Sequence, residues 1–144
     1  MSDIIIGRKA EQEILRQRIE SKSPELIAIY GRRRIGKTFL VRQYFNDTFH
    51  FYSTGIYQGT KKEQLGEFNR QLEYYSGRKW KLAKDWFDAF AQLREYLESI
   101  NGDNPIVVFL DELPWMDTQK SRFIKAFEFF WNSWGATNNR LKLI

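Results

Sequence analysis

The sequence predicts an α/β fold with a mainly parallel sheet. Short apolar runs alternate along the chain with segments of helical periodicity. This alternation is typical of parallel strands that are joined by helices. A glycine-containing loop, GRRRIGKT at 31–38, stands between one apolar run and a helical segment. A chain of 144 residues suits one domain with one core.

The first half of the chain contains two expected strands. A helix is expected over 8–22, where Ser23 and Pro24 end it, and a strand over 26–30 leads into the glycine-containing loop. A helix from Lys37 to about residue 45, an aromatic strand over 49–54, a loop over 55–59 and a helix over 61–76 follow.

The second half shows stronger patterns. Asp85 is expected to cap a helix whose apolar stripe includes Trp86, Phe90, Leu93 and Leu97. A strand is expected over 106–110, and Pro114 follows as a stop. A helix over 121–134 has a wide apolar face that includes Ile124, and Gly135 is its expected C-cap. A last strand begins at residue 141.

Composition excludes several functions. The chain has no Cys and one His, His50, so disulfides, thiolate metal sites and a Ser-His-Asp triad are not expected. The apolar runs fall far short of the roughly 20 residues that cross a bilayer. The N-terminus has no signal-peptide layout, so we expect a cytoplasmic protein with no membrane partner.

The net charge of +5 is concentrated near the loop. Residues 1–42 hold ten Lys and Arg against five Asp and Glu, whereas 43–144 hold thirteen of each. Four of the ten cations lie within 31–38, so a bound triphosphate accounts for much of the basic character without a nucleic-acid surface.

The loop matches the G-x-x-x-x-G-K-[ST] pattern of a phosphate-binding P-loop. Gly31 and Gly36 allow the backbone N–H groups to curl around phosphate oxygens, and the following helix directs its positive end at them. Lys37 can reach the β- and γ-phosphates, and Thr38 offers a hydroxyl to Mg²⁺. We therefore expect ATP and Mg²⁺ as ligands. The binding residues expected in addition are Arg32, Arg33, Arg34, Ile35 and Phe39, the arginines mainly through their backbone N–H groups.

The expected strand over 106–110 ends in two carboxylates. Open α/β sheets bind ligands at the carboxyl ends of their strands. Asp111 is therefore expected to hold Mg²⁺, through a water, and Glu112 to orient or deprotonate an attacking water. Glu112 and Lys37 are the expected catalytic residues.

Three blocks carry a family resemblance. They are Ile6-Gly7-Arg8 with Glu11 and Leu15, the segment IYGRRRIGKTFLVRQYF at 29–45, and the segment IVVFLDELPWMD at 106–117 with the aromatic helix after it. Together they resemble the archaeal-type ATPases of the STAND class of P-loop NTPases, which are related to AAA+ proteins. The resemblance implies that Gly7 and Arg8 lie beside the adenine. It also implies a three-layer fold with sheet order 5-1-4-3-2.

The resemblance further implies what lies beyond this sequence. Relatives continue with a fifth strand, a helical lid and often a winged helix, so residues 1–144 are expected to be the first part of an ATPase domain, truncated within strand 4 and lacking strand 5. The implied function is hydrolysis of ATP to ADP and phosphate, coupled to conformational change and to contacts with the lid or other copies of the protein.

Two alternatives stay open from the sequence. One is a nucleotide-binding interaction module without significant turnover. The other is a nucleic-acid-associated ATPase fragment that uses the basic connector at 78–81, although a short basic run is more often a solvated loop.

Overall fold

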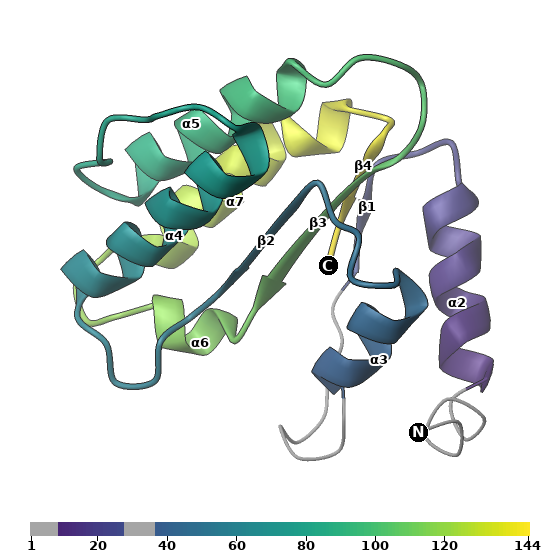
Figure 1. The fold of residues 1–144 in the computed structure, drawn as a ribbon, viewed down its shortest axis with the longest axis horizontal. Coiled ribbons are helices and arrows are strands. Elements are labelled where there is room, and N and C mark those ends of the chain that lie inside the picture. The colour runs from purple at the N-terminus through teal and green to yellow at the C-terminus, as the bar shows by residue number, and fades with distance from the viewer. Residues whose placement is uncertain (1–8, 28–36) are drawn as a thin grey trace.

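The computed structural model describes residues 9–27 and 37–144. A four-stranded sheet lies between two layers of helices (Figure 1). The strands are β1 (Glu25–Leu26), β2 (Phe51–Thr54), β3 (Ile106–Asp111) and β4 (Leu141–Leu143). Their order is β1-β4-β3-β2, and every neighbouring pair is parallel. The predicted α/β class, the parallel pairing and the order 1-4-3-2 are confirmed.

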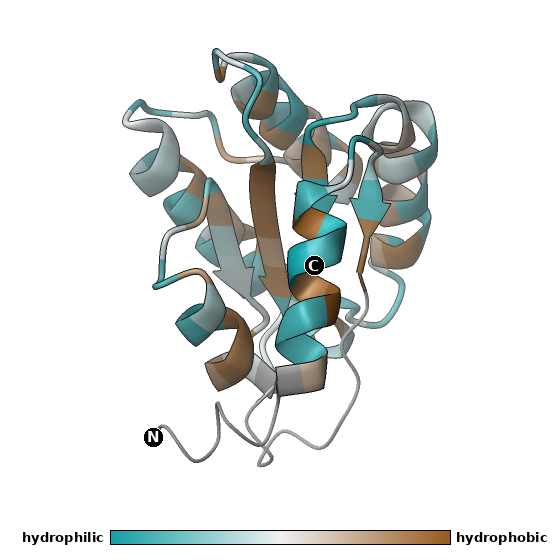
Figure 2. Ribbon diagram, turned by 90° about the vertical axis from the view of Figure 1, so that its right-hand side faces the viewer, coloured by the Kyte–Doolittle hydropathy of each residue, from teal (hydrophilic) through white to brown (hydrophobic). Residues whose placement is uncertain are grey.

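The helices divide between the two faces of the sheet. One face is covered by α4 (Lys61–Ser76), α5 (Trp86–Glu98) and α7 (Phe123–Ser133), and the other by α2 (Lys9–Glu20) and α3 (Lys37–Tyr44) (Figure 1). Figure 2 shows α2 in front of the sheet, mainly hydrophilic toward the viewer, with a hydrophobic strand behind it.

The central strand β3 is buried along its whole length. Ile106, Val108 and Leu110 belong to the core that includes α4, α5 and α7. Val107 and Phe109 point to the opposite face and pack with Val41 of α3. This alternation, with apolar residues on both faces, is what a strand covered by helices on both sides requires.

The helix starts agree with the sequence signals. Thr60 accepts a hydrogen bond from the N–H of Glu63, and the Glu63 carboxylate accepts one from the N–H of Thr60, which forms a capping box before α4. Asp85 accepts a hydrogen bond from the N–H of Asp88 and caps α5 as predicted. The strand expected over 26–30 starts at Glu25, and its predicted residues 28–30 lie outside the described residues.

The structure corrects three details near the end of the chain. A short helix, α6 (Leu113–Met116), was not predicted, because Pro114 reads equally as a strand stop and as a first-turn helix residue. The prediction that Gly135 caps α7 is wrong: Trp134 holds the cap position and Gly135 opens the 3₁₀ helix η2 (Gly135–Thr137). The expected core residue Ile124 is 47% exposed.

Close packing explains the glycine at position 135. A Cβ atom there would lie 2.6 Å from Cε3 of Trp131, so the position needs the absence of a side chain rather than a left-handed backbone.

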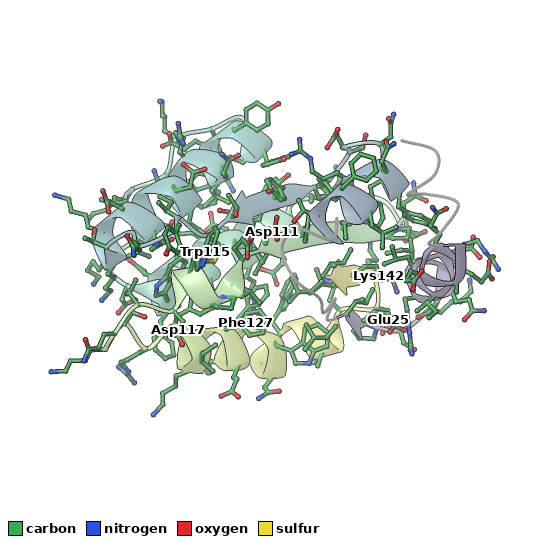
Figure 3. All side chains as sticks on the ribbon, turned by 90° about the horizontal axis from the view of Figure 1, so that it is seen from below. Glu25, Asp111, Trp115, Asp117, Phe127 and Lys142 are labelled. Atoms are coloured by element: carbon green, nitrogen blue, oxygen red, sulfur yellow. The ribbon has the colours of Figure 1, made fainter. Side chains whose placement is uncertain are left out.

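Lys142 is an unexpected component of the central sheet. It lies in β4 opposite Glu25 of β1 and is fully buried (Figure 3). Its ammonium group donates hydrogen bonds to the carbonyl oxygens of Ser21, at 2.8 Å, and Ser23, which follow α2. Burial lowers the pKa of Lys142, and the nearby Glu25 opposes that shift. The side chain therefore ties the end of α2 to β4.

Candidate functional site

Two predicted metal ligands meet at the carboxyl end of β3. Thr38, in the first turn of α3, donates a hydrogen bond from Oγ1 to Oδ2 of Asp111 at 2.8 Å. The two residues are 73 positions apart in the chain. Figure 3 looks from below at this edge of the sheet, with Asp111 labelled. The first turn of the helix after the glycine-containing loop is thus hydrogen-bonded, through Thr38, to the carboxylate at the end of the central strand.

Asp111 is held by three donors. Its side chain is 6% exposed. Besides Thr38, the Tyr52 hydroxyl lies 3.4 Å from Oδ2 and the backbone N–H of Glu112 lies 3.0 Å from Oδ1. Burial, with the negative charge of Asp111 as the next cause, raises the pKa of Tyr52 to about 12. Tyr52 is therefore a neutral hydroxyl donor over the physiological pH range.

Glu112 has an unusual backbone conformation. With φ 54° and ψ 48° it lies in the left-handed region and stands at the N-cap of α6. Non-glycine residues rarely adopt this conformation, and those that do are common at functional sites. The turn at Glu112 carries the chain from β3 directly into α6, so the residue expected to act on water directly follows the carboxylate expected to hold Mg²⁺.

Gly55 allows the loop after β2 to approach this turn. A Cβ atom on Gly55 would lie 2.5 Å from the carbonyl oxygen of Glu112 and 2.8 Å from Cβ of Trp115. The N–H of Gly55 donates a hydrogen bond to the carbonyl oxygen of Asp111 at 3.0 Å. The two segments that leave β2 and β3 are therefore in direct backbone contact.

A buried side chain holds the same loop. Gln64 of α4 is 2% exposed. Its Oε1 accepts a hydrogen bond from the N–H of Ile56 at 2.8 Å, and its Nε2 donates one to the carbonyl oxygen of Ile56 at 2.7 Å. The exposed ring of Tyr57 packs edge-on against Trp115 of α6, with centroids 5.3 Å apart. Gln64 thus fixes the loop that approaches Glu112.

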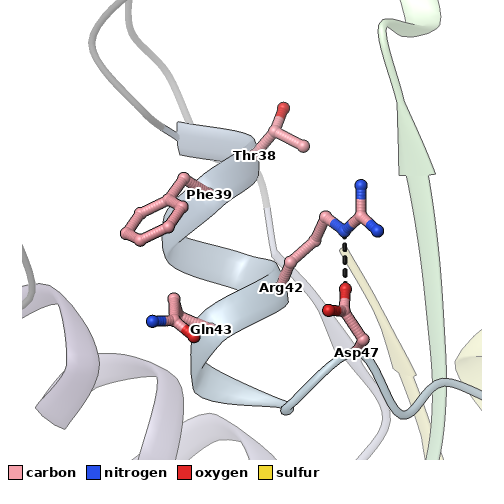
Figure 4. Close-up of a pocket in the computed structure, with 5 residues that line it drawn as sticks. All are labelled: Thr38, Phe39, Arg42, Gln43 and Asp47. Atoms are coloured by element: carbon pink, nitrogen blue, oxygen red, sulfur yellow. Dashed lines mark hydrogen bonds and ion pairs between the residues drawn. The ribbon is translucent and has the colours of Figure 1, made fainter. Parts of the chain in front are cut away.

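A cavity of about 350 Å³ adjoins Thr38 on α3 (Figure 4). The residues that line it are Thr38, Phe39, Arg42, Gln43 and Asp47. Arg42 and Asp47 point toward one another, and Nε of Arg42 lies 2.6 Å from Oδ1 of Asp47 (Figure 4). The guanidinium carbon of Arg42 lies 5.8 Å from the centroid of the Tyr52 ring. The cavity therefore adjoins Thr38, one of the two expected metal ligands, and Arg42, whose guanidinium group lies near the Tyr52 ring.

The structure describes some of the expected site residues and not others. Thr38 and Phe39 lie in the first turn of α3, Asp111 ends β3 and Glu112 follows it. The backbone of Lys37 begins α3. The other expected binding residues lie outside the described residues: Gly7, Arg8, Gly31, Arg32, Arg33, Arg34, Ile35 and Gly36.

The chemistry of the pair fits magnesium. Within 9–27 and 37–144, no group of three or more His, Asp or Glu side chains could hold a metal ion. Mg²⁺ does not require such a cluster, because it is usually bound by one or two carboxylates, waters and substrate phosphates. The Thr38 hydroxyl and the Asp111 carboxylate are hard oxygen ligands that already converge, so these residues could hold the ion.

The basic connector makes contacts within the protein. The Arg78 guanidinium carbon lies 4.1 Å from the centroid of the Trp80 ring, and Nε1 of Trp80 donates a hydrogen bond to Oγ of Ser76 at 2.9 Å. Lys79 pairs with Glu73 at 3.7 Å and Arg78 with Glu95 at 3.7 Å. Two of the cations that the sequence offered for nucleic acid, Arg78 and Lys79, are therefore paired with acidic residues of α5 and α4.

The parallel sheet between two layers of helices is consistent with a P-loop-like α/β fold. No protein-family model matches the sequence. The chain is similar to an uncharacterized protein of the archaeon Methanocaldococcus jannaschii, with 25% identity over 125 residues, 87% of this chain. The match spans 25% of that protein, so this chain corresponds to about a quarter of its length.

A second similar protein has a more informative name. It is an uncharacterized ATP-binding protein of the same archaeon, 36% identical over 44 residues. These residues make up 31% of this chain and 75% of that protein. At this identity and coverage, the two proteins belong to one family.

In the described part of this chain, no helix has the length and apolar character needed to cross a membrane.

Proposed function

We propose that this chain is an ATPase module that binds ATP with Mg²⁺ and couples the nucleotide state to conformational change. The observation that carries the proposal is the hydrogen bond of 2.8 Å between Thr38 and Asp111. It joins the end of the P-loop sequence to the carboxylate of the central strand, where ligands of open α/β sheets bind. The ATP-binding relative and the parallel sheet support the same class of ligand.

Each residue has a distinct role in the proposal. The loop at 31–36 and Lys37 hold the phosphates, and Phe39 lies beside the nucleotide. Thr38 and Asp111 hold the metal ion. Bound Mg²⁺ neutralises charge on the phosphates as the γ-phosphate is transferred to water. Glu112 orients the attacking water or accepts its proton, because it directly follows the metal-binding carboxylate.

The resemblance to STAND ATPases supports a role as a switch. In that role, a change from ATP to ADP alters contacts with neighbouring segments or with other copies of the protein. The conformational element that responds would be α6, since it begins at Glu112 and its Trp115 contacts Tyr57 of the loop after β2.

The test separates binding from turnover. Lys37→Ala is expected to weaken ATP binding measured by calorimetry, while Lys125→Ala, at an exposed position of α7, serves as the matched control. Glu112→Gln is expected to retain ATP binding and lose phosphate release. Equal affinity of Lys37→Ala and the parent would disprove the nucleotide site. Tight binding of ATP without phosphate release by the parent would favour the interaction-module alternative.

A further inference from the structure

Tyr52 contacts the carboxylate of Asp111, and Tyr52 itself belongs to neither sequence motif. Its hydroxyl lies 3.4 Å from Oδ2 of Asp111, the same oxygen that accepts the hydrogen bond of Thr38. The other oxygen, Oδ1, accepts from the N–H of Glu112. Two of these donors come from the P-loop helix and the turn after β3, and the third comes from the neighbouring strand β2.

The position of the Tyr52 hydroxyl is fixed by packing. The ring stacks on Phe49 with centroids 5.8 Å apart, and it contacts Phe109 of β3 at 5.2 Å. The Arg42 guanidinium lies 5.8 Å from the ring centroid and is itself paired with Asp47. Ring neighbours on β3 and in the segment before β2 therefore restrict the orientation of the ring that carries the hydroxyl group.

Strand pairing sets the direction of this contact. Tyr52 pairs with Phe109, and Thr54 pairs with Asp111, so Tyr52 lies one same-face position before the carboxylate along the parallel strands. A tyrosine is long enough to span that step and approach the carboxylate from the sheet side. Thr38 approaches from α3 and shares Oδ2 with Tyr52, and the N–H of Glu112 takes one lone pair of Oδ1, so one lone pair on Oδ1 is left for a metal ion or its water.

We propose that Tyr52 is a positioning residue that orients the Asp111 carboxylate for Mg²⁺ at the nucleotide site. This inference rests on the proposed function. Residues that hydrogen-bond to a metal-ligating side chain fix the orientation of that side chain. Their loss typically weakens metal binding about 10- to 100-fold. In this role Tyr52 acts on the metal through Asp111, so its loss should affect metal affinity and leave metal-free nucleotide binding unchanged.

A purely structural role makes a different prediction. If the Tyr52 hydroxyl only satisfied a buried carboxylate, its removal would lower thermal stability and leave the metal affinity of the folded protein unaltered. The two roles therefore separate when metal affinity is measured on folded protein at known nucleotide occupancy.

The experiment compares Tyr52→Phe with Tyr96→Phe. Tyr96 is a matched control because its buried hydroxyl also donates a hydrogen bond, to the carbonyl oxygen of His50 at 2.6 Å, away from Asp111. Binding of Mn²⁺, as a probe for Mg²⁺, is measured by electron paramagnetic resonance with the protein saturated by a non-hydrolysable ATP analogue. Binding of the analogue with a metal chelator present is measured separately.

We expect Tyr52→Phe to bind Mn²⁺ at least about tenfold more weakly, with unchanged analogue binding in chelator, and Tyr96→Phe to match the parent. Equal Mn²⁺ affinity of Tyr52→Phe and the parent would overturn the inference while leaving the nucleotide site intact. No binding of the analogue by the parent would instead refute the proposed function on which the inference rests.

A second variant tests the inference independently in case Tyr52→Phe does not fold. Phe49→Leu retains the Tyr52 hydroxyl and removes the aromatic ring stacked on it. If the hydroxyl must be held in place, this variant also weakens Mn²⁺ binding, by less than Tyr52→Phe. Parent-like Mn²⁺ affinity in Phe49→Leu, with circular dichroism showing a native fold, would count against positioning by the packed ring.

Discussion

The Thr38 hydroxyl lies 2.8 Å from the carboxylate of Asp111 and donates a hydrogen bond to it across 73 positions of the chain. This contact connects the first turn of α3 to the end of β3. A hydrogen bond to a charged group typically contributes about 1.5–3 kcal/mol to stability. The pair should therefore be energetically coupled in the protein without nucleotide or metal.

A double-mutant cycle tests this coupling. Thr38→Val removes the hydroxyl and keeps the branched shape, and Asp111→Asn removes the charge. We expect each change to lower the free energy of unfolding, and the double mutant to lose less than the sum by about 0.5–3 kcal/mol. Urea denaturation with a metal chelator present measures all four proteins. Additive losses would show that the two side chains are independent.

The close contact between Gly55 and Glu112 predicts that adding one methyl group at position 55 strongly lowers stability. Gly55→Ala places Cβ 2.5 Å from the Glu112 carbonyl oxygen, so the backbone of one segment must move. Overpacking of this kind costs about 1–3 kcal/mol. We expect a lower urea midpoint and, because Glu112 is displaced, slower phosphate release.

Gly66→Ala is the matched control for this change. Gly66 lies within α4, and a Cβ atom there would meet nothing within 4 Å. Alanine in a helix interior is favoured over glycine by roughly 0.5–1 kcal/mol, so this variant should be more stable than the parent. If both alanine variants were stabilised, the loop at Gly55 would be free to move away from Glu112.

His50 predicts a loss of stability at acid pH. Its Nδ1 accepts a hydrogen bond from the N–H of Val107 at 3.0 Å, which requires an unprotonated nitrogen. Burial, and secondarily the charge of Arg140, lowers the pKa of His50 from 6.5. Because the folded pKa is depressed, the unfolded chain binds more protons in this range. The stabilisation is complete above pH 6.5 and is lost as pH falls through the folded pKa.

The measurement is simple because the chain contains one histidine. Nuclear magnetic resonance should give a His50 pKa below 6.5 in the folded protein. The free energy of unfolding should fall below that pH with a slope of up to about 1.4 kcal/mol per pH unit. His50→Gln, which retains an acceptor for Val107, should show a smaller slope. A folded pKa at or above the ordinary value would contradict this account.

The left-handed backbone at Glu112 predicts an inverted order of stability. Left-handed conformation costs roughly 1–2 kcal/mol for a residue with a Cβ atom, and glycine avoids this cost. Glu112→Gly should therefore be more stable to urea than Glu112→Ala, although glycine is usually the less stable of the two. Both variants should lose phosphate release. Greater stability of the alanine variant would show that residue 112 leaves this conformation.

The sequence predicted the parts of the site that depend on local patterns. The motif ending in Thr38 and the apolar run ending in Asp111 each have a fixed local geometry, and parallel strands bring their carboxyl ends to one edge. Tyr52, Gly55 and Gln64 were missed because their roles depend on how β2 pairs with β3 and on where a loop crosses α6. One available signal was Gly55 directly after a strand, since glycine there often marks a close backbone approach.

The same limit applies to the fold. Helix positions and strand order were predicted because periodicity and caps are local and because the resemblance supplied the order. The burial of Lys142 was not predicted, because a lysine between two leucines normally points to solvent. Its burial is explained by the carbonyl groups after α2 that accept its hydrogen bonds. The role of Gly135 was predicted wrongly because glycine is expected both at a helix C-cap and where an aromatic ring packs closely on the backbone, and the sequence does not distinguish the two.

The position of β4 between β1 and β3 has a consequence for how the protein is made. β1 precedes the glycine-containing loop, yet its partner in the described sheet is β4, at Leu141–Leu143. During synthesis β1 therefore lacks its partner in the described sheet until residues more than a hundred positions later have left the ribosome. Contacts so distant in the chain form slowly. β1 therefore reaches its place beside β4 only after Leu141–Leu143 have been synthesised.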